Sequence, residues 1–96
     1  MISADFVRAL NITSEVTEIE SRMILSKSRR MEYVEARMLL VKAMNEMGYH
    51  PMQIAPRMRI SVNAVRALLD NFPIREKADK ILSKMYIEII KKLSEN

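Results

Sequence analysis

The chain of 96 residues contains no cysteine, no tryptophan and a single glycine, Gly48. Without cysteine, disulfide scaffolds, zinc fingers and thiol chemistry are excluded. One glycine cannot form the Gly-rich loops that cradle phosphates in nucleotide-binding folds. Tight β-hairpin turns favour Asn-Gly and Asp-Gly pairs, and neither dipeptide occurs in the chain. These absences argue against nucleotide-binding folds and antiparallel sheets.

Long apolar runs are also missing, since none approaches the roughly 18 residues of a membrane-spanning helix. The first residues lack the basic and then apolar pattern of a secretory signal. Hydrophobic residues make up 49% and charged residues 29%, which favours a packed globule. The most frequent residue types are mostly good helix formers. We therefore predict one all-α domain over residues 1–96, with about six helices, in the cytoplasm.

The first twenty residues predict two short helices. Ser3 is suited to cap the first, and the segment Asn11-Ile12-Thr13-Ser14 predicts a break in which Thr13 or Ser14 caps the second. Residues 22–30 then form a basic connection without a carboxylate. The residues expected to face inward are Phe6, Val7 and Leu10 in the first helix and Val16 and Ile19 in the second.

A third helix is predicted from Met31 to Met47. Its polar residues fall near one narrow stripe, so it should be enclosed on most sides and form the centre of the domain. Gly48 follows where a left-handed residue ends a helix. After residues 71–73, a last amphipathic helix of about 20 residues is expected from its apolar residues at three- and four-residue steps.

Residues 51–70 carry the spacing of a helix-turn-helix, a motif whose second helix enters the DNA major groove. A plain pair of core helices would show a similar apolar periodicity and is the alternative. The motif needs an apolar and a small residue in the first helix, apolar residues under the turn, and anchors in the second helix. These positions are Ile54, Ala55, Met58, Ile60, Val65 and Leu68.

Three residues determine how the motif is built locally. Ser61 is suited to cap the second helix and so leave its amides facing a phosphate. Arg59 occupies the turn position where many such motifs place glycine to reach positive φ. Pro56 falls inside the first helix, where it removes a backbone hydrogen bond, so this helix should either start late or be kinked.

The charge pattern agrees with a surface that faces DNA. Three arginines and no carboxylate lie between Met47 and Leu69, and a second basic segment precedes Met31. Residues 1–21 are net acidic, so positive charge is segregated along the chain. A solvated basic face without a partner is the alternative, because a net charge of +4 does not by itself identify one.

The order of these elements resembles the C-terminal DNA-binding domain (domain IV) of the bacterial replication initiator DnaA. The likeness runs from about Ser3 to Leu93 and includes the basic segment Lys27-Ser28-Arg29-Arg30, the long-helix segment Ala36-Arg37-Met38-Leu39-Leu40, the helix-turn-helix and a closing helix. The resemblance implies a Trp-repressor-like helical bundle and a role in DNA replication or transcription regulation in a bacterium or phage. The initiator's ATPase lies outside this likeness, so no nucleotide chemistry is implied.

The resemblance also nominates individual residues. In that family an arginine eight residues before the long-helix arginine enters the minor groove, and Arg29 has this spacing from Arg37. Arg37 either belongs to the same contact or is structural, bridging glutamate or backbone groups. The family's Asp-His-Thr-Thr-Val signature is replaced here by Ser61-Val62-Asn63-Ala64-Val65, so we expect a DNA sequence preference different from the family's.

Ten residues are expected to touch double-stranded DNA. Asn and Arg make bidentate hydrogen bonds to adenine and guanine, and an aliphatic side chain can lie on a thymine methyl group. Val62, Asn63 and Arg66 are therefore predicted to read bases. Contacts to phosphates, or in the minor groove, are predicted for Lys27, Arg29, Arg30, Gln53, Arg57, Arg59 and Ser61.

An enzyme, a cofactor and a metal site are not expected. His50 is the only histidine, and with no cysteine it has no partners of the usual zinc-binding types. Its place before Pro51 suggests a helix N-terminus or a loop. The methionines Met38, Met44, Met47, Met58 and Met85 have core spacing and should fill gaps between helices; a methionine-rich groove for peptides is the less favoured alternative.

A rival reading is a protein-interaction module that keeps the fold without binding DNA. Pro56 and the divergent second helix of the motif are the reasons to consider it. The closing helix also offers Tyr86, Ile87 and Ile90 as an apolar face for a homodimer or a larger assembly. A dimer would place two DNA half-sites about 34 Å apart, one turn of the duplex.

Overall fold

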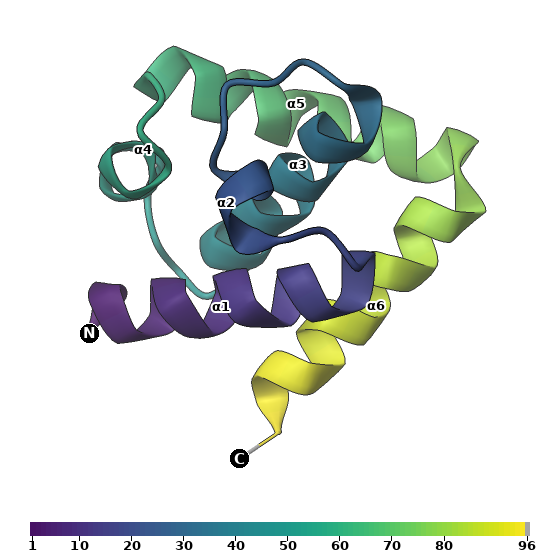
Figure 1. The fold of residues 1–96 in the computed structure, drawn as a ribbon, viewed down its shortest axis with the longest axis horizontal. Coiled ribbons are helices and arrows are strands. Elements are labelled where there is room, and N and C mark those ends of the chain that lie inside the picture. The colour runs from purple at the N-terminus through teal and green to yellow at the C-terminus, as the bar shows by residue number, and fades with distance from the viewer. Residues whose placement is uncertain (96) are drawn as a thin grey trace.

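The computed structural model describes residues 1–95, and these form six α-helices and no strand. The all-α prediction is therefore confirmed. No described helix is long and apolar enough to cross a membrane. The helices, whose arrangement Figure 1 shows, are α1 (Ile2–Thr17), α2 (Ser21–Ile24), α3 (Met31–Glu46), α4 (Pro51–Met58), α5 (Val62–Ala78) and α6 (Lys80–Ser94).

Helix α3 is the centre of the fold, as its nearly uniform apolar character predicts. It packs against each of the other five helices in the described chain. Gly48 follows with φ of 101° and ends the helix with a double hydrogen bond: its N–H donates to Asn45 O (3.0 Å), and the N–H of Tyr49 donates to Met44 O (3.2 Å). This pattern is the Schellman motif, so the predicted end of the helix is confirmed.

The prediction of two short N-terminal helices is wrong, because α1 is continuous from Ile2 to Thr17. Residue Met1 occupies the N-cap, and Ser3 makes no capping hydrogen bond. The run 11–14 is not a break, since Thr13 is fully buried and continues the inward face set by Ala9. Ser14 donates to Ile19 O (2.6 Å) at the C-terminal end of the helix and caps no second helix.

The core consists of two clusters of buried side chains that share partly buried neighbours, Leu68 and Leu93. The first cluster lies among α1, α3 and the α4–α5 pair, and the second lies among α3, α5 and α6. Helix α6 thus closes the second cluster, and the shared leucines make the core continuous. The core methionines follow the prediction: Met38, Met44 and Met58 are buried, and Met47 and Met85 pack at the edge of the clusters.

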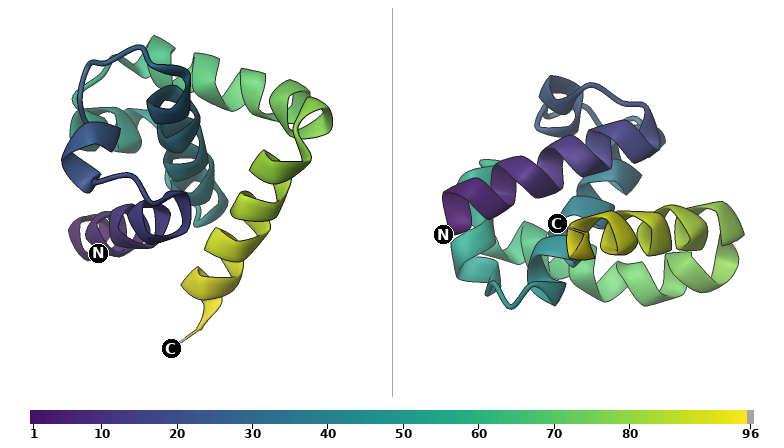
Figure 2. Two further views of the ribbon diagram at one scale, coloured as in Figure 1. Left: turned by 45° about the vertical axis from the view of Figure 1, so that its right-hand side comes forward. Right: turned by 90° about the horizontal axis from the view of Figure 1, so that it is seen from below.

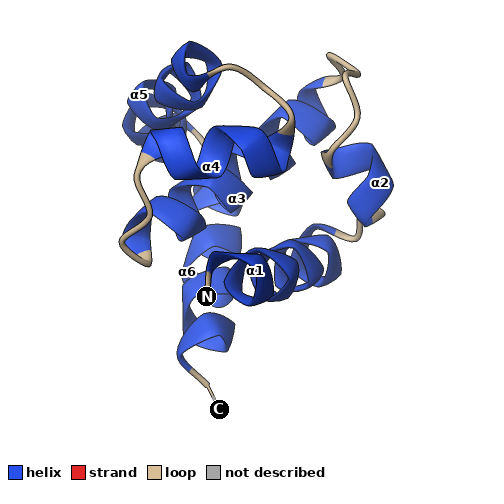
Figure 3. Ribbon diagram, turned by 90° about the vertical axis from the view of Figure 1, so that its left-hand side faces the viewer, coloured by secondary structure: helices blue, strands red, loops and turns tan. Residues whose placement is uncertain are grey.

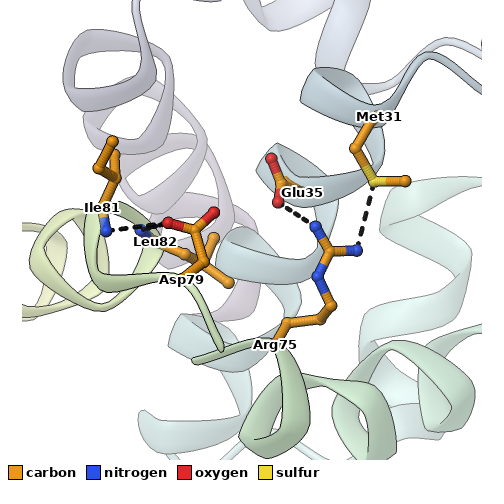
Figure 4. A network of polar contacts seen from close by, with 6 residues as sticks. All are labelled: Met31, Glu35, Arg75, Asp79, Ile81 and Leu82. Atoms are coloured by element: carbon orange, nitrogen blue, oxygen red, sulfur yellow. Dashed lines mark hydrogen bonds and ion pairs between the residues drawn. The ribbon is translucent and has the colours of Figure 1, made fainter. Parts of the chain in front are cut away.

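The boundary predicted after residues 71–73 is also wrong. Helix α5 continues through Pro73 to Ala78, and the break lies at Asp79. The carboxylate of Asp79 accepts hydrogen bonds from the N–H groups of Ile81 (2.9 Å) and Leu82 (3.2 Å), which starts α6 (Figure 4). Phe72, directly before the proline, is buried in the second cluster, so packing holds the helix together where the missing N–H would weaken it.

One ion pair ties the second half of α5 to α3. Arg75 pairs with Glu35 and also donates to the sulfur of Met31 at 3.3 Å (Figure 4). Because both charged side chains are partly buried, solvent and salt screen their attraction less than at a fully exposed site. The pair orients α5 along α3 and so helps to place the N-terminal half of α5, which carries the predicted DNA contacts.

Candidate nucleic-acid interface

Helices α4 and α5 form the predicted helix-turn-helix pair, joined by residues 59–61. They lie together at the top of Figure 3. Every position that the motif requires is directed inward. Ile54, Ala55, Met58 and Val65 are buried, and Ile60 and Leu68 pack against the same core.

The start of α4 is fixed by a cap that His50 and Gln53 form together. The ring Nδ1 of His50 accepts from the N–H of Met52 (3.1 Å), and Gln53 Oε1 accepts from the N–H of His50 (2.9 Å). Pro51 occupies the first helical position, where no N–H is needed. The helix therefore begins five residues before Pro56, so of the two alternatives that this proline suggested, the late start is wrong. His50 is a helix cap, as its place before Pro51 suggests.

The turn has the backbone geometry expected of Arg59. This residue is left-handed, with φ of 59°. The N–H of Ile60 donates to Ala55 O (3.2 Å), which closes the end of α4. Ser61 then caps α5, because its hydroxyl accepts from the N–H of Ala64 at 3.0 Å. The prediction of Ser61 as the N-cap is confirmed.

The basic segment before α3 is held in shape by its two serines. Ser26 accepts from the N–H of Ser28 and donates to Met23 O (2.7 Å), and Ser28 accepts from the N–H of Arg30. The serines are partly buried, and the alternating residues Lys27 and Arg29 are exposed. The Ser-Lys-Ser-Arg alternation is thus a signal for which cations face outward, and the sequence analysis missed it.

Two hydrogen bonds from Arg37 of α3 hold this loop in place. Its Nε donates to the carbonyl of Ile24 (2.7 Å) and its Nη2 donates to the hydroxyl of Ser26 (3.3 Å). The side chain is only 9% exposed and has no carboxylate partner among the described residues. Burial accordingly lowers the pKa of the Arg37 guanidinium from its ordinary value. Of the two alternatives for Arg37, the bridge to backbone groups is the one observed.

The loop and the turn face each other across a groove of about 520 Å³. Lys27 and Arg29 lie on the loop side, Arg59 and Ser61 lie on the turn side, and Arg37 also lines the groove. Segments about 30 residues apart in sequence therefore meet beside the N-terminus of α5. No carboxylate lines the groove. Such a site favours anions, because both the arginines and the helix N-terminus are positive.

The first turns of α5 present two of the three predicted base-reading residues. Asn63 and Arg66 are exposed. Val62 is partly buried against the first core cluster, so less of its side chain is available to a thymine than predicted. On α4, Gln53 and Arg57 are exposed, although the side-chain oxygen of Gln53 is occupied by the cap.

Ion pairing separates the predicted basic contacts into two groups. Arg30 pairs with Glu32 (2.9 Å) and lies over the ring of Tyr33. Its charge is therefore compensated, unlike the charges of the other predicted basic contacts. Within residues 1–95, no ion pair is made by Lys27, Arg29, Arg57, Arg59 or Arg66.

Metal-ligand clusters are not found in the described part of the chain, where no three His, Asp or Glu side chains converge. Tyr49 donates to Asp5 and has a raised pKa, first through this hydrogen bond, but the pair joins α1 to the residues after α3 and lies outside the groove. Comparison of the chain with models of protein families, with curated proteins and with solved structures gives no match.

Proposed function

We propose that this protein binds double-stranded DNA with a sequence preference, with α5 as the recognition helix, in replication initiation or transcription regulation. The observation that supports this most is the gathering of uncompensated cations from two distant segments around the start of α5. Lys27, Arg29 and Arg59 line the groove, and Arg57 and Arg66 are exposed on the last turn of α4 and the second turn of α5. Cations without ion-pair partners repel one another, and this repulsion lowers the stability of the fold. Binding to a polyanion such as DNA removes the repulsion.

The roles of the residues follow from their places. Asn63 and Arg66 are exposed on the first turns of α5, where a recognition helix contacts base edges. Arg59 and the N-terminal amides of α5 adjoin the groove and suit a phosphate. Arg29 projects from the serine-braced loop and suits a narrow minor groove, the role that the resemblance to the initiator domain implies.

The first test measures binding to a labelled duplex of randomised sequence by fluorescence anisotropy over a range of salt concentrations. With four to six phosphate contacts we expect the logarithm of the binding constant to fall against the logarithm of salt with a slope of about −4 to −5. The variant Arg57→Gln should reduce the slope by about 1 for every sequence. Arg22 is exposed on α2 and pairs with Glu20, the residue before that helix. The variant Arg22→Gln is the matched control, and the salt slope of its DNA binding should equal that of the native protein.

The role of Arg66 needs a second readout. After preferred sites have been selected from the random library, Arg66→Gln should relax the preference at one base pair and cost about 1–3 kcal/mol there. Equal weakening on all sequences would make Arg66 a phosphate contact. No binding by the native protein at low salt would refute the DNA proposal and favour the protein-interaction module.

A further inference from the structure

The groove between the loop of residues 25–30, called the basic loop below, and the turn of residues 59–61 has two buried side chains at its bottom. Of the residues that line it, Arg37 is 9% exposed and Met58 is 2% exposed. Lys27, Arg29 and Arg59 line the same groove but are exposed, so they lie at its rim. The deepest part of the groove therefore combines a charged group with an apolar one.

The guanidinium of Arg37 has one nitrogen left for a ligand. Its Nε and Nη2 donate to the basic loop, and its Nη1 makes no hydrogen bond within residues 1–95. Nη1 is also not one of the side-chain atoms of the described chain that are enclosed without a partner. It is therefore open to solvent in the groove that Arg37 lines, and its two N–H groups have no protein acceptor.

No carboxylate neutralises the cations of the groove. The three carboxylates nearest to the basic loop in sequence each have a cation of their own, in the pairs Glu20–Arg22, Glu32–Arg30 and Glu35–Arg75. On the other side of the groove, the sequence between Met47 and Leu69 contains no carboxylate. Four cations and no carboxylate line the groove, so it favours an anion of high charge.

The turn side of the groove adds neutral donors. The hydroxyl of Ser61 accepts from the N–H of Ala64 (3.0 Å), which leaves its own O–H free to donate. The first amides of α5 follow directly after it, and such amides have no partner within a helix. A phosphate group suits this combination of guanidinium, hydroxyl and amide donors, because it carries several acceptor oxygens.

The size and the apolar part of the lining indicate a small molecule. Leu25 and Ile60 are partly buried and line the groove together with Met58. The volume of about 520 Å³ lies in the range of about 300–1,000 Å³ that is typical of small-molecule sites. A phosphate monoester carries a charge of about −1.5 to −2 at neutral pH, more than a phosphodiester of DNA, and its organic part can cover the apolar lining.

We infer that the groove is a binding site for a small phosphate monoester with an apolar body, and that this ligand excludes DNA from the loop and the turn. The phosphate meets Nη1 of Arg37 between Arg29 and Arg59, and the apolar body covers Met58. Binding of the ligand stands on the groove alone, whereas the exclusion of DNA rests on the proposed function. DNA binding then falls as the concentration of the ligand rises.

The test uses phenyl phosphate as the probe and the full chain as the protein. Isothermal titration calorimetry at low salt measures the dissociation constant, and amide chemical shifts locate the ligand. The shifts should concentrate in residues 27–30 and 59–63. Two related compounds should bind about tenfold more weakly or worse: methyl phenyl phosphate, which carries one charge less, and inorganic phosphate, which lacks the apolar body.

Substitutions on both sides of the groove test the assignment of the residues. Arg59→Gly keeps the left-handed backbone of the turn and removes one cation, so it should weaken phenyl phosphate binding by about tenfold or more. Arg29→Gln should act in the same direction from the basic loop. The matched control is Arg57→Gln, because Arg57 is an exposed arginine that does not line the groove. This variant should bind phenyl phosphate like the native protein, although it weakens DNA binding.

Competition with DNA is measured by fluorescence anisotropy of a labelled duplex, with sodium chloride added to the reference sample to match the ionic strength. Phenyl phosphate at ten times its dissociation constant should raise the apparent dissociation constant of the duplex about elevenfold, because the ligand and the duplex compete for the free protein. A duplex affinity that stays unchanged under these conditions overturns the exclusion of DNA.

The remaining outcomes separate the failure of this site from the failure of the proposed function. A native protein that binds a duplex but not phenyl phosphate overturns the small-molecule site and leaves the proposed function intact. Binding of phenyl phosphate without binding of any duplex supports the site and refutes the proposed function. Inorganic phosphate that binds as tightly as phenyl phosphate overturns the inferred ligand class. Native affinity for phenyl phosphate in both Arg59→Gly and Arg29→Gln places the ligand outside the groove and overturns the inference.

Discussion

A guanidinium that is buried without a carboxylate has to be stabilised by neutral acceptors, and Arg37 is held in this way. The carbonyl of Ile24 and the hydroxyl of Ser26 accept its hydrogen bonds, so its charge remains uncompensated. As a result, the loop before α3 is fixed to the central helix. The charge of Arg37 also adds to the positive potential of the groove that it lines. Arg75, which meets Glu35 instead, contributes only to the packing of α5 on α3.

Replacing Arg37 tests this residue without reference to DNA. Arg37→Met should lower the free energy of unfolding by about 1–3 kcal/mol, because a charged donor is lost to two acceptors. The loop should loosen as well, and hydrogen exchange at the amides of Ser28 and Arg30 reports this directly. Arg37→Lys, which keeps the charge but not the fork, should give an intermediate effect. Unchanged exchange at these amides in Arg37→Met would show that the serines hold the loop alone.

At the scale of helices, the ends are determined by single residues with distinct chemistry. Asp79 and Ser61 accept N–H groups at helix starts, His50 does the same through its ring, and Gly48 provides a left-handed end. The caps at His50 and Ser61 fix where α4 and α5 begin, and Ser61 also lines the groove. A change at an end should move a whole helix, whereas a change in an exposed helix centre should not.

Gly48 allows a clean test of a helix end. A Cβ at this position meets no atom within 4 Å, so the cost of a side chain comes only from φ of 101°. Gly48→Ala should lower the free energy of unfolding by about 1–2 kcal/mol, measured by urea denaturation. Gly48→Asn should cost less, because asparagine tolerates positive φ better than alanine. Equal stability of the alanine variant and the native protein would contradict the role of this glycine.

For the whole molecule, the two core clusters decide how stability responds to conditions. They meet at Leu68 and Leu93, so we expect the described helices to unfold in one transition. The second cluster also contains the packing partner of Phe72, Tyr86, whose hydroxyl is buried without a hydrogen-bond partner among the described residues. Burial, and then the nearby Glu46 and Glu76, raise the pKa of Tyr86 above its ordinary value of 10.0.

This raised pKa predicts how stability changes at alkaline pH. Because the folded state favours the neutral phenol, its contribution is complete below the ordinary pKa and is lost as pH rises above it. Tyr86→Phe should therefore lose less stability than the native protein between about pH 8 and pH 11. Near neutral pH it should be as stable as the native protein or up to about 1 kcal/mol more stable, since an unpaired buried hydroxyl is removed.

The measurement is urea denaturation followed by circular dichroism at both ends of this pH range. Tyr33→Phe serves as the matched control, since Tyr33 lies at the edge of α3 beside Arg30 and outside both clusters. If Tyr86→Phe loses as much free energy of unfolding at alkaline pH as the native protein does, another group controls that loss.

Sequence reasoning found the elements whose apolar pattern is unambiguous. The central helix, its end at Gly48, the cap at Ser61 and the left-handed Arg59 all agree with the structure. It failed where local preferences conflicted with packing. Residues 11–14 and Pro73 suggested helix breaks, yet buried Thr13 and Phe72 keep both helices continuous because core contacts outweigh weak local propensity.

In the candidate site, too, some features are determined by the sequence and others by the tertiary structure. Which cations exist, and that no carboxylate lies between Met47 and Leu69, is fixed by the order of residues. Only the tertiary structure decided that Arg37 lies under the loop and that Lys27 and Arg29 face Arg59 across one groove. The reason is physical: helix periodicity and capping act over a few residues, whereas ion pairing, burial and the direction of a surface depend on helices that meet only after folding.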